Sequence, residues 1–184
     1  MNAKEAPVLY TYCLFCLTQR CAAIRRLLSL YGDYEVLQPR IVQRKWVKGQ
    51  AHQEMHDYLP GYLFVYTSEP IASTREICSL DGVVRFLQPE RIGGEPRVEP
   101  LSGADLAFAD MLYRCNGVID TVRVYREGDR LRLASGMLEG MEGEILRVDN
   151  HRKRLEMRFT FDRVSRRVWV GFDEVELKND TSAP

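Results

Sequence analysis

The nine residues Tyr58–Tyr66, YLPGYLFVY, combine a tight turn with a strand that follows it at once. Pro60 and Gly61 are typical of a turn, because proline fixes φ and glycine accepts positive φ. The residues after the turn are apolar, aromatic or β-branched, which is typical of a strand buried on both faces. Val8–Leu17 has the same composition. The sequence therefore predicts two buried strands.

Between and after these strands the pattern predicts helices and a hairpin. A helix is expected after the first strand, capped by Thr18, because the hydrophobic period becomes helical there. Further helices are expected to begin near Pro70 and after Ser102. Residues 34–57 are expected to form a polar hairpin, and residues 88–100 a loop. The order β-α-β-β-β-α-β predicts an α/β sandwich.

Cys13, Cys16 and Cys21 have a spacing that is also typical of metal sites. Residues three apart on a strand point to opposite faces, however, and Cys21 falls on the expected helix. Cys13 and Cys16 therefore cannot share one set of ligands. We interpret these cysteines as buried structural thiols.

Beyond Gly117 the sequence is typical of an all-β region. Apolar and polar residues alternate strictly over Leu155–Phe161, and shorter alternating runs lie on either side. Short strands separated by polar turns predict a small β-barrel. The predicted fold class is therefore α+β, an α/β sandwich followed by a small β-barrel.

Three of these stretches resemble the NusG family of transcription factors. LPGYLFVY (Leu59–Tyr66) resembles the F-P-G-Y-h-h-V strand of the family's N-terminal domain. SLDGVVRFL (Ser79–Leu87) resembles its x-x-P-G-V-x-x-F-h element. EGDRLRLASGMLEGMEGEILRVD (Glu127–Asp149) resembles the KOW motif, in which Gly136, Gly140 and Gly143 would bend a barrel strand. The resemblance implies three segments: an N-terminal NusG (NGN) domain at 8–113, a linker at 114–122 and an SH3-like KOW β-barrel at 123–178.

The resemblance also implies a partner and contact residues. Family members bind RNA polymerase at the clamp helices of its largest subunit and close the cleft over DNA. Leu59, Tyr62 and Phe64 match the apolar strand of the polymerase-binding surface, although strand residues of this kind can also be core residues. Arg20 and Arg40 match positions near the non-template DNA strand, where the alternative is a solvated arginine.

The expected barrel is locally basic. Residues 147–167 contain eight lysines and arginines against three acidic residues. The basic KOW turn resembles LoaP-type paralogues, whose barrels bind an RNA stem-loop; the alternative is a solvated charged rim. The two ends of the strand at 154–161 would lie about 25 Å apart, so their side chains cannot contact one phosphate. The predicted nucleic-acid-binding residues are Arg20, Arg40, His151, Arg152, Lys153, Arg154, Arg158, Arg166 and Arg167.

Departures from the family pattern, such as Leu59 for Phe and Met137 for Pro, suggest a specialised paralogue. We therefore expect a factor for processive antitermination of specific operons, whose barrel binds an RNA hairpin. One alternative is a general NusG-type factor that couples polymerase to Rho or the ribosome. Another is a ribosome-associated KOW module that binds RNA.

Composition restricts the other classes. Lys plus Arg and Asp plus Glu are each 26, and the five cysteines form no disulfide framework. The apolar run at 8–17 is too short to span a membrane. His52, Glu54 and His56 share one strand face but offer only adventitious metal binding. We therefore expect a cytoplasmic monomer with no enzymatic activity and no cofactor.

Overall fold

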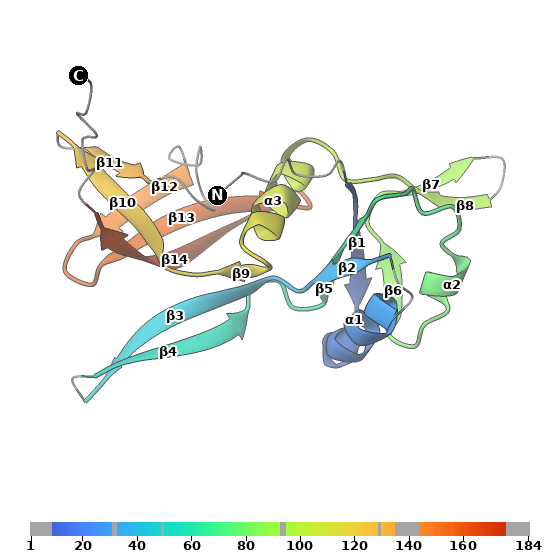
Figure 1. Cartoon of the computed structure of the whole chain (residues 1–184), viewed down its shortest axis with the longest axis horizontal. Coiled ribbons are helices and arrows are strands. Elements are labelled where there is room, and N and C mark those ends of the chain that lie inside the picture. Colours follow the sequence, from blue (N-terminus) through green and yellow to red (C-terminus); the bar gives the residue numbers. More distant parts are fainter. Residues whose placement is uncertain are drawn as a thin grey trace, which may run out of the picture. The chain divides into compact units, whose positions relative to one another are not determined.

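The computed structural model describes residues 9–30, 33–48, 50–92, 95–128, 130–134 and 144–175. Contacts divide the chain into two units. Unit 1 comprises Met1–Arg40 and Asp57–Gly117, and unit 2 comprises Ile41–His56 and Val118–Pro184. Helices lie in unit 1, and both units contain sheets (Figure 1), so the predicted α+β class is confirmed.

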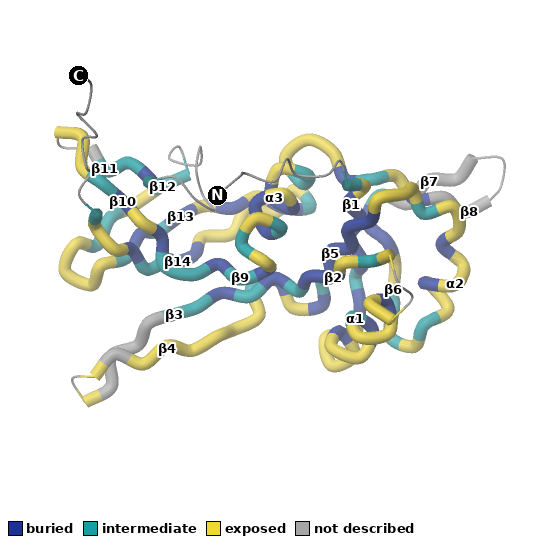
Figure 2. Tube along the Cα trace, in the orientation of Figure 1, coloured by how far each residue is buried: buried dark blue, intermediate teal, exposed yellow. Residues whose placement is uncertain are grey.

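Unit 1 is built on a four-stranded sheet in which the YLFVY segment is an inner strand. The strand order is β2 (Glu35–Leu37), β5 (Tyr62–Thr67), β1 (Tyr10–Cys16) and β6 (Val83–Phe86). All three pairings are antiparallel, and the register of β1 with β5 places Cys13 opposite Phe64. Figure 2 shows β1 and β5 as largely buried. Both predicted strands are therefore confirmed as core elements.

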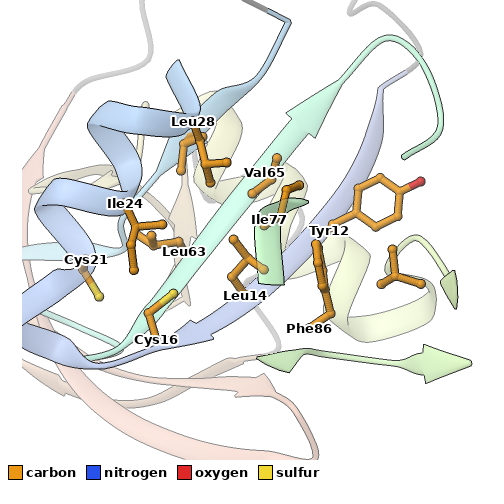
Figure 3. Close-up of a cluster of buried hydrophobic side chains, with 12 residues drawn as sticks. Tyr12, Leu14, Cys16, Cys21, Ile24, Leu28, Leu63, Val65, Ile77 and Phe86 are labelled. Atoms are coloured by element: carbon orange, nitrogen blue, oxygen red, sulfur yellow. The ribbon is translucent and has the colours of Figure 1, made fainter. Parts of the chain in front are cut away.

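Helices cover both faces of this sheet. The cluster in Figure 3 joins the even-numbered residues of β1 to Ile24 of α1 (Cys21–Leu30) and Ile77 of α2 (Arg75–Cys78). On the opposite face lies α3 (Gly103–Arg114), where the ring centroids of Phe64 and Phe108 are 5.8 Å apart. Alternation along one strand thus supplies apolar side chains to two helical layers.

Two glycine turns hold the end of β1. The Cys16 amide donates to the Gly61 carbonyl at 2.7 Å, and the Leu17 amide donates to the Gly82 carbonyl at 2.8 Å. Gly61 has φ +89° and Gly82 has φ +97°, conformations that other residues rarely adopt. A Cβ at Gly82 would lie 2.5 Å from Cβ of Arg20. At both positions, therefore, glycine is favoured by the backbone angle and by the lack of room for a Cβ atom.

The helix starts differ from the predictions. Thr18 does not cap α1, because Thr18–Arg20 form a 3₁₀ turn preceded by Leu17, with no side-chain capping bond. The expected helix start near Pro70 is also wrong. The Ile71 amide bonds instead to the Tyr12 hydroxyl at 3.2 Å, and α2 begins only at Arg75. Ser102 does precede α3, although its hydroxyl makes no capping bond.

The segment at 88–100, expected to be a loop, contains a two-stranded antiparallel ribbon. Its strands are β7 (Pro89–Ile92) and β8 (Glu95–Val98). The expected polar hairpin at 34–57 is confirmed only in its later part, as β3 (Arg40–Val47) and β4 (Gln50–Asp57), because Glu35–Leu37 form β2 and pair with β5 instead. Strands β3 and β4 form a three-stranded sheet with β9 (Val118–Ile119).

Unit 2 contains a curled five-stranded sheet in the order β11-β10-β14-β13-β12, which forms a half-barrel (Figure 1). Its apolar face includes Leu155, Met157, Val168 and Val170, all buried. The predicted small barrel is therefore present in this curled form. The strand bounds are β10 Val122–Glu127, β11 Arg130–Leu133, β12 Ile145–Asp149, β13 Arg154–Phe161 and β14 Val164–Glu174.

Two sets of predictions lie partly or wholly outside what the structure describes. The KOW glycines Gly136, Gly140 and Gly143 fall outside the described residues, as does everything after Val175. The boundaries 8–113, 114–122 and 123–178 stay a prediction, and they differ from the contact units in where Ile41–His56 belongs. Within the described ranges, no helix is both long and apolar enough to cross a membrane.

Candidate nucleic-acid interface

The β13–β14 ladder separates an apolar face from a polar one. Leu155, Met157, Phe159 and Phe161 are buried on one side, and the residues between them point to the other side. The antiparallel register continues this division into β14. We call the polar side the outer ladder face; it consists of Arg154, Glu156, Arg158, Thr160, Ser165, Arg167, Trp169 and Gly171.

Two arginines face each other on the outer ladder face. Arg158 and Arg167 are direct cross-strand partners, and both are exposed. Like charges in this position repel each other, so the pair costs stability unless anions lie nearby. Glu144 supplies one, since its Oε2 accepts from Nε of Arg158 at 3.0 Å. Among the described residues the Arg167 side chain has no ion-pair partner.

A third arginine is fixed beside an indole ring. The guanidinium carbon of Arg154 lies 4.2 Å from the ring centroid of Trp169, close enough for a cation–π interaction. Its Nε also donates to Oδ2 of Asp149 at 3.1 Å. The other carboxylate oxygen of Asp149 accepts from the Arg152 amide at 3.0 Å. This amide first, and Arg154 second, hold the pKa of Asp149 below its ordinary value.

The basic turn before β13 is less cationic than its sequence suggests. Nζ of Lys153 lies 3.3 Å from Oε2 of Glu174, whose other oxygen accepts from Nε of Arg126 at 2.6 Å. These two cations lower the pKa of Glu174, Arg126 more than Lys153. His151 and Arg152 are exposed and form no ion pair among the described residues. The turn therefore offers two accessible basic side chains rather than four.

The structure brings together only some of the predicted basic residues. Arg154, Arg158 and Arg167 lie on the outer ladder face, whereas Arg166 pairs with Phe159 and points to the other side, where it is exposed. His151, Arg152 and Lys153 occupy the turn. Arg166 and Arg167 were expected at the far end of the strand from the turn. They lie part of the way along the ladder instead, with Arg167 directly across from Arg158, so the predicted separation from the turn holds only in part.

Sequence reasoning missed Trp169, the one aromatic side chain of the outer ladder face. It is partly exposed and stands opposite Glu156. A signal was present in the sequence, because Val168, Val170 and Phe172 alternate and are buried, which places Trp169 on the polar side. Applying the period-two pattern to β14 as well as β13 would have identified it.

The predicted polymerase-binding residues do not form one surface. Leu59 is 2% exposed and Phe64 is fully buried, so these two are core residues of unit 1. This burial agrees with the alternative given above, that they are core residues, and their contact with a partner stays a prediction. Tyr62 is partly exposed, and its ring centroid lies 5.1 Å from that of Phe15. The guanidinium carbon of Arg85 lies 5.9 Å from the Phe15 ring centroid. Tyr62, Phe15 and Arg85 thus form an aromatic patch across three strands.

The two arginines expected near DNA have different environments. Arg20 forms an ion pair with Asp81 at the surface of unit 1. Arg40 begins β3, where its amide donates to the Gly117 carbonyl at 2.8 Å. Its Nε is buried and has no hydrogen-bond partner among the described residues. The Arg20 side chain is thus exposed but ion-paired, whereas part of the Arg40 side chain is buried.

Cys13, Cys16 and Cys21 are packing residues in this arrangement. Cys16 and Cys21 lie in the core cluster between β1 and α1 (Figure 3), and Cys13 is buried on the opposite side of the strand. Burial raises the pKa of the Cys16 thiol to about 12. The thiol is therefore protonated near neutral pH and is a poor nucleophile or metal ligand. Within the described ranges, no three His, Cys, Asp or Glu side chains are grouped to hold a metal ion.

Comparison with known proteins found similarity to solved structures. No protein-family model matches the chain, and no curated protein matches it. Among solved structures, one similar chain is NusG of Thermotoga maritima, in a structure concerned with the interaction of its domains. That match covers 89% of this chain and 93% of the other, with 14% sequence identity and a TM-score of 0.49.

Proposed function

We propose that this protein is a NusG-type elongation factor that binds RNA polymerase through unit 1 and RNA through unit 2. Its role would be processive antitermination of specific operons, with an RNA stem-loop as the recruiting signal. The proposal requires no catalytic residue and no cofactor, and it places the protein in the cytoplasm as a monomer. It rests on the three motifs that resemble the family and on the chemistry of the two surfaces.

The facing pair of Arg158 and Arg167 is the observation that favours RNA. Two arginines at one cross-strand position are unfavourable without an anion, and a phosphate between them would offset their repulsion. The outer ladder face has three arginines against one acid, Glu156. Exposed ion pairs such as Arg158 with Glu144 are weak, so a phosphate can compete with the carboxylate.

The aromatic patch of Tyr62, Phe15 and Arg85 supports docking on polymerase. Aromatic and arginine side chains are enriched at the centres of protein interfaces. Leu59 and Phe64 would hold the strand that presents Tyr62. For Arg20 and the non-template DNA strand, the ion pair with Asp81 implies that binding requires this pair to open. Removing Asp81 should therefore strengthen any contact of Arg20 with DNA.

The test combines two binding measurements on the full chain. Purified protein should retain core RNA polymerase on a column, and Tyr62→Ala should reduce the retained polymerase. Hairpin RNAs with a randomised loop should bind with salt-dependent affinity, and Arg167→Gln should lower the slope of log affinity against log salt by about 1. Arg132→Gln is a matched control, because Arg132 lies on β11, off the outer ladder face.

Each result separates the proposal from its alternatives. Polymerase retention without RNA binding would favour a general factor that couples polymerase to Rho or the ribosome. RNA binding without polymerase retention would favour a ribosome-associated KOW module. Loss of both would contradict the proposal as a whole.

A further inference from the structure

We infer that the outer ladder face binds an unpaired nucleotide of the RNA, with its base stacked on Trp169 and its phosphate between Arg158 and Arg167. The inference rests on the proposed function, because it takes RNA as the ligand of unit 2. It goes further by naming the single-stranded part of the RNA as the recognised element and by assigning a residue that the basic pattern does not include.

The spacing of the three side chains suits one nucleotide. Arg167 and Trp169 lie two residues apart on β14 and point to the same side, which places their Cα atoms about 7 Å apart. Arg158 stands directly across from Arg167. A phosphate held by the two arginines would therefore leave its base within reach of the indole. The double-stranded part of a hairpin has no such base to offer, because its bases are already stacked on one another.

The position of Trp169 is unusual for a residue that serves only to pack. The apolar side of the ladder is formed by other residues, and Val168 and Val170 on either side of Trp169 are buried there. Trp169 points away from this core and is partly exposed. An aromatic ring on the polar face of a sheet, flanked by arginines, is a common platform for the bases of single-stranded nucleic acid.

Arg154 keeps this platform in place before RNA binds. Its guanidinium is held at one point by Asp149 and lies against the indole of Trp169, so two contacts limit its rotation. A side chain that is already ordered loses less conformational freedom on binding than a flexible one. Arg154 is in this sense a positioning residue: it orients the indole and presents its remaining N–H donors at the edge of the subsite.

A protein ligand is the competing occupant, and the charge pattern disfavours it. The side chains around Trp169 are Arg154, Arg158 and Arg167, with Glu156 directly opposite Trp169, so three cations stand against one acid. The facing pair of arginines calls for an anion between two guanidinium groups. A nucleotide supplies a phosphate and a flat base in one unit. An acidic peptide would need an aromatic residue at the right distance from its carboxylate to supply both.

The chain contains two tryptophans, Trp46 and Trp169, which allows a direct test. In a Trp46→Phe variant of the full chain, all indole fluorescence comes from Trp169. Titration with hairpin RNA that carries a randomised loop should quench this fluorescence to saturation, because a stacked base quenches an indole. A fully paired duplex of the same stem should give little quenching. Binding is followed in parallel by the anisotropy of a dye on the RNA.

Substitutions then separate stacking from stability. Trp169→Leu should weaken binding of the loop RNA by about tenfold, and Trp169→Phe should recover part of this loss because a smaller ring still stacks. Arg154→Lys keeps the charge but should weaken loop binding, since the flat contact with the indole is lost. Thermal unfolding of each variant shows whether the fold is retained, and Arg132→Gln again serves as the control.

Three outcomes overturn the inference, and they differ in what else they affect. If anisotropy reports RNA binding while Trp169 is not quenched, the RNA binds away from Trp169. If loop and duplex quench Trp169 equally, the RNA lies near this residue without an unpaired base stacked on it. In both of these cases the binding of RNA by the protein stands. If neither RNA binds at low salt, the inference and the RNA part of the proposed function both fail. Retention of polymerase is measured separately and distinguishes this case from failure of the whole proposal.

Discussion

The amide of Cys16 donates a hydrogen bond of 2.7 Å to the carbonyl of Gly61, and this bond fixes the turn of the LPGY motif against the end of β1. A Cβ at Gly61 would lie 2.8 Å from the Cys16 carbonyl oxygen, on a backbone with φ +89°. We expect Gly61→Ala to lower the free energy of unfolding by about 2–4 kcal/mol, from strain and overpacking together.

Gly103→Ala is the matched control for this prediction. Gly103 also has positive φ, +58°, but an added Cβ would meet nothing within 4 Å. We expect a loss of about 1 kcal/mol from the backbone conformation alone. Urea unfolding of both variants measures the difference, and equal losses would show that the contact with Cys16 is unimportant.

Phe64 and Tyr62 lie two residues apart on β5, and their substitution is expected to affect different properties, stability and partner binding. Phe64 is fully buried against Phe108, so Phe64→Ala should destabilise unit 1 by about 3–5 kcal/mol. Tyr62→Ala should cost much less stability and should reduce the binding of polymerase. Chemical denaturation and polymerase retention, measured on both variants, test this division. A Tyr62→Ala protein with normal retention would remove the aromatic patch from the proposed interface.

The buried hydroxyl of Tyr66 predicts sensitivity to alkaline pH. It donates to the Ala109 carbonyl at 2.7 Å, and burial raises the pKa of Tyr66 well above its ordinary value of 10.0. Because the folded pKa is raised, this stabilisation is present below pH 10 and is lost as the pH rises further. Tyr66→Phe should cost about 1 kcal/mol near neutral pH and should make unfolding less pH-dependent above pH 10. An unchanged alkaline profile would contradict this.

For Asp149 we expect the opposite pH dependence of stability, at acid pH. Its pKa is held below the ordinary value of 3.8, first by the Arg152 amide and then by Arg154. A lowered folded pKa means that the stabilisation is present above the unfolded pKa and is lost as the pH falls through the folded pKa. Carboxyl NMR should place the Asp149 midpoint below 3.8 and should show it rising in Arg154→Gln. Arg167→Gln should leave the midpoint nearly unchanged.

The elements with strong local patterns were predictable from the sequence. The buried strands β1 and β5 and the alternating strand β13 follow from the sequence, because a core on one or both faces leaves a clear period in the chain. The helix starts near Thr18 and Pro70 do not, since tertiary bonds such as that from Ile71 to the Tyr12 hydroxyl decide them.

The candidate interface was predictable only in its charge. Counting basic residues found Arg154, Arg158 and Arg167, but the pairing of Arg158 directly across from Arg167 depends on strand register, which the sequence does not determine without the partner strand. Burial limits the prediction of the polymerase site from sequence in a similar way. Phe64 is an apolar strand residue like Tyr62, and the packing of α3 against it distinguishes the two. Leu59 lies in the turn before β5 and is buried as well.

Strand β14 has a consequence for the order in which the chain can fold. Val164–Gly171 pairs with β13, and Phe172–Glu174 pairs in parallel with β10. During translation, the β10–β11 and β12–β13 hairpins therefore exist without the strand that unites them until β14 has left the exit tunnel. The residues of unit 1 end at Gly117, so that unit is available for folding earlier. A chain truncated before Val164 would thus retain the earlier unit and lose the assembled half-barrel.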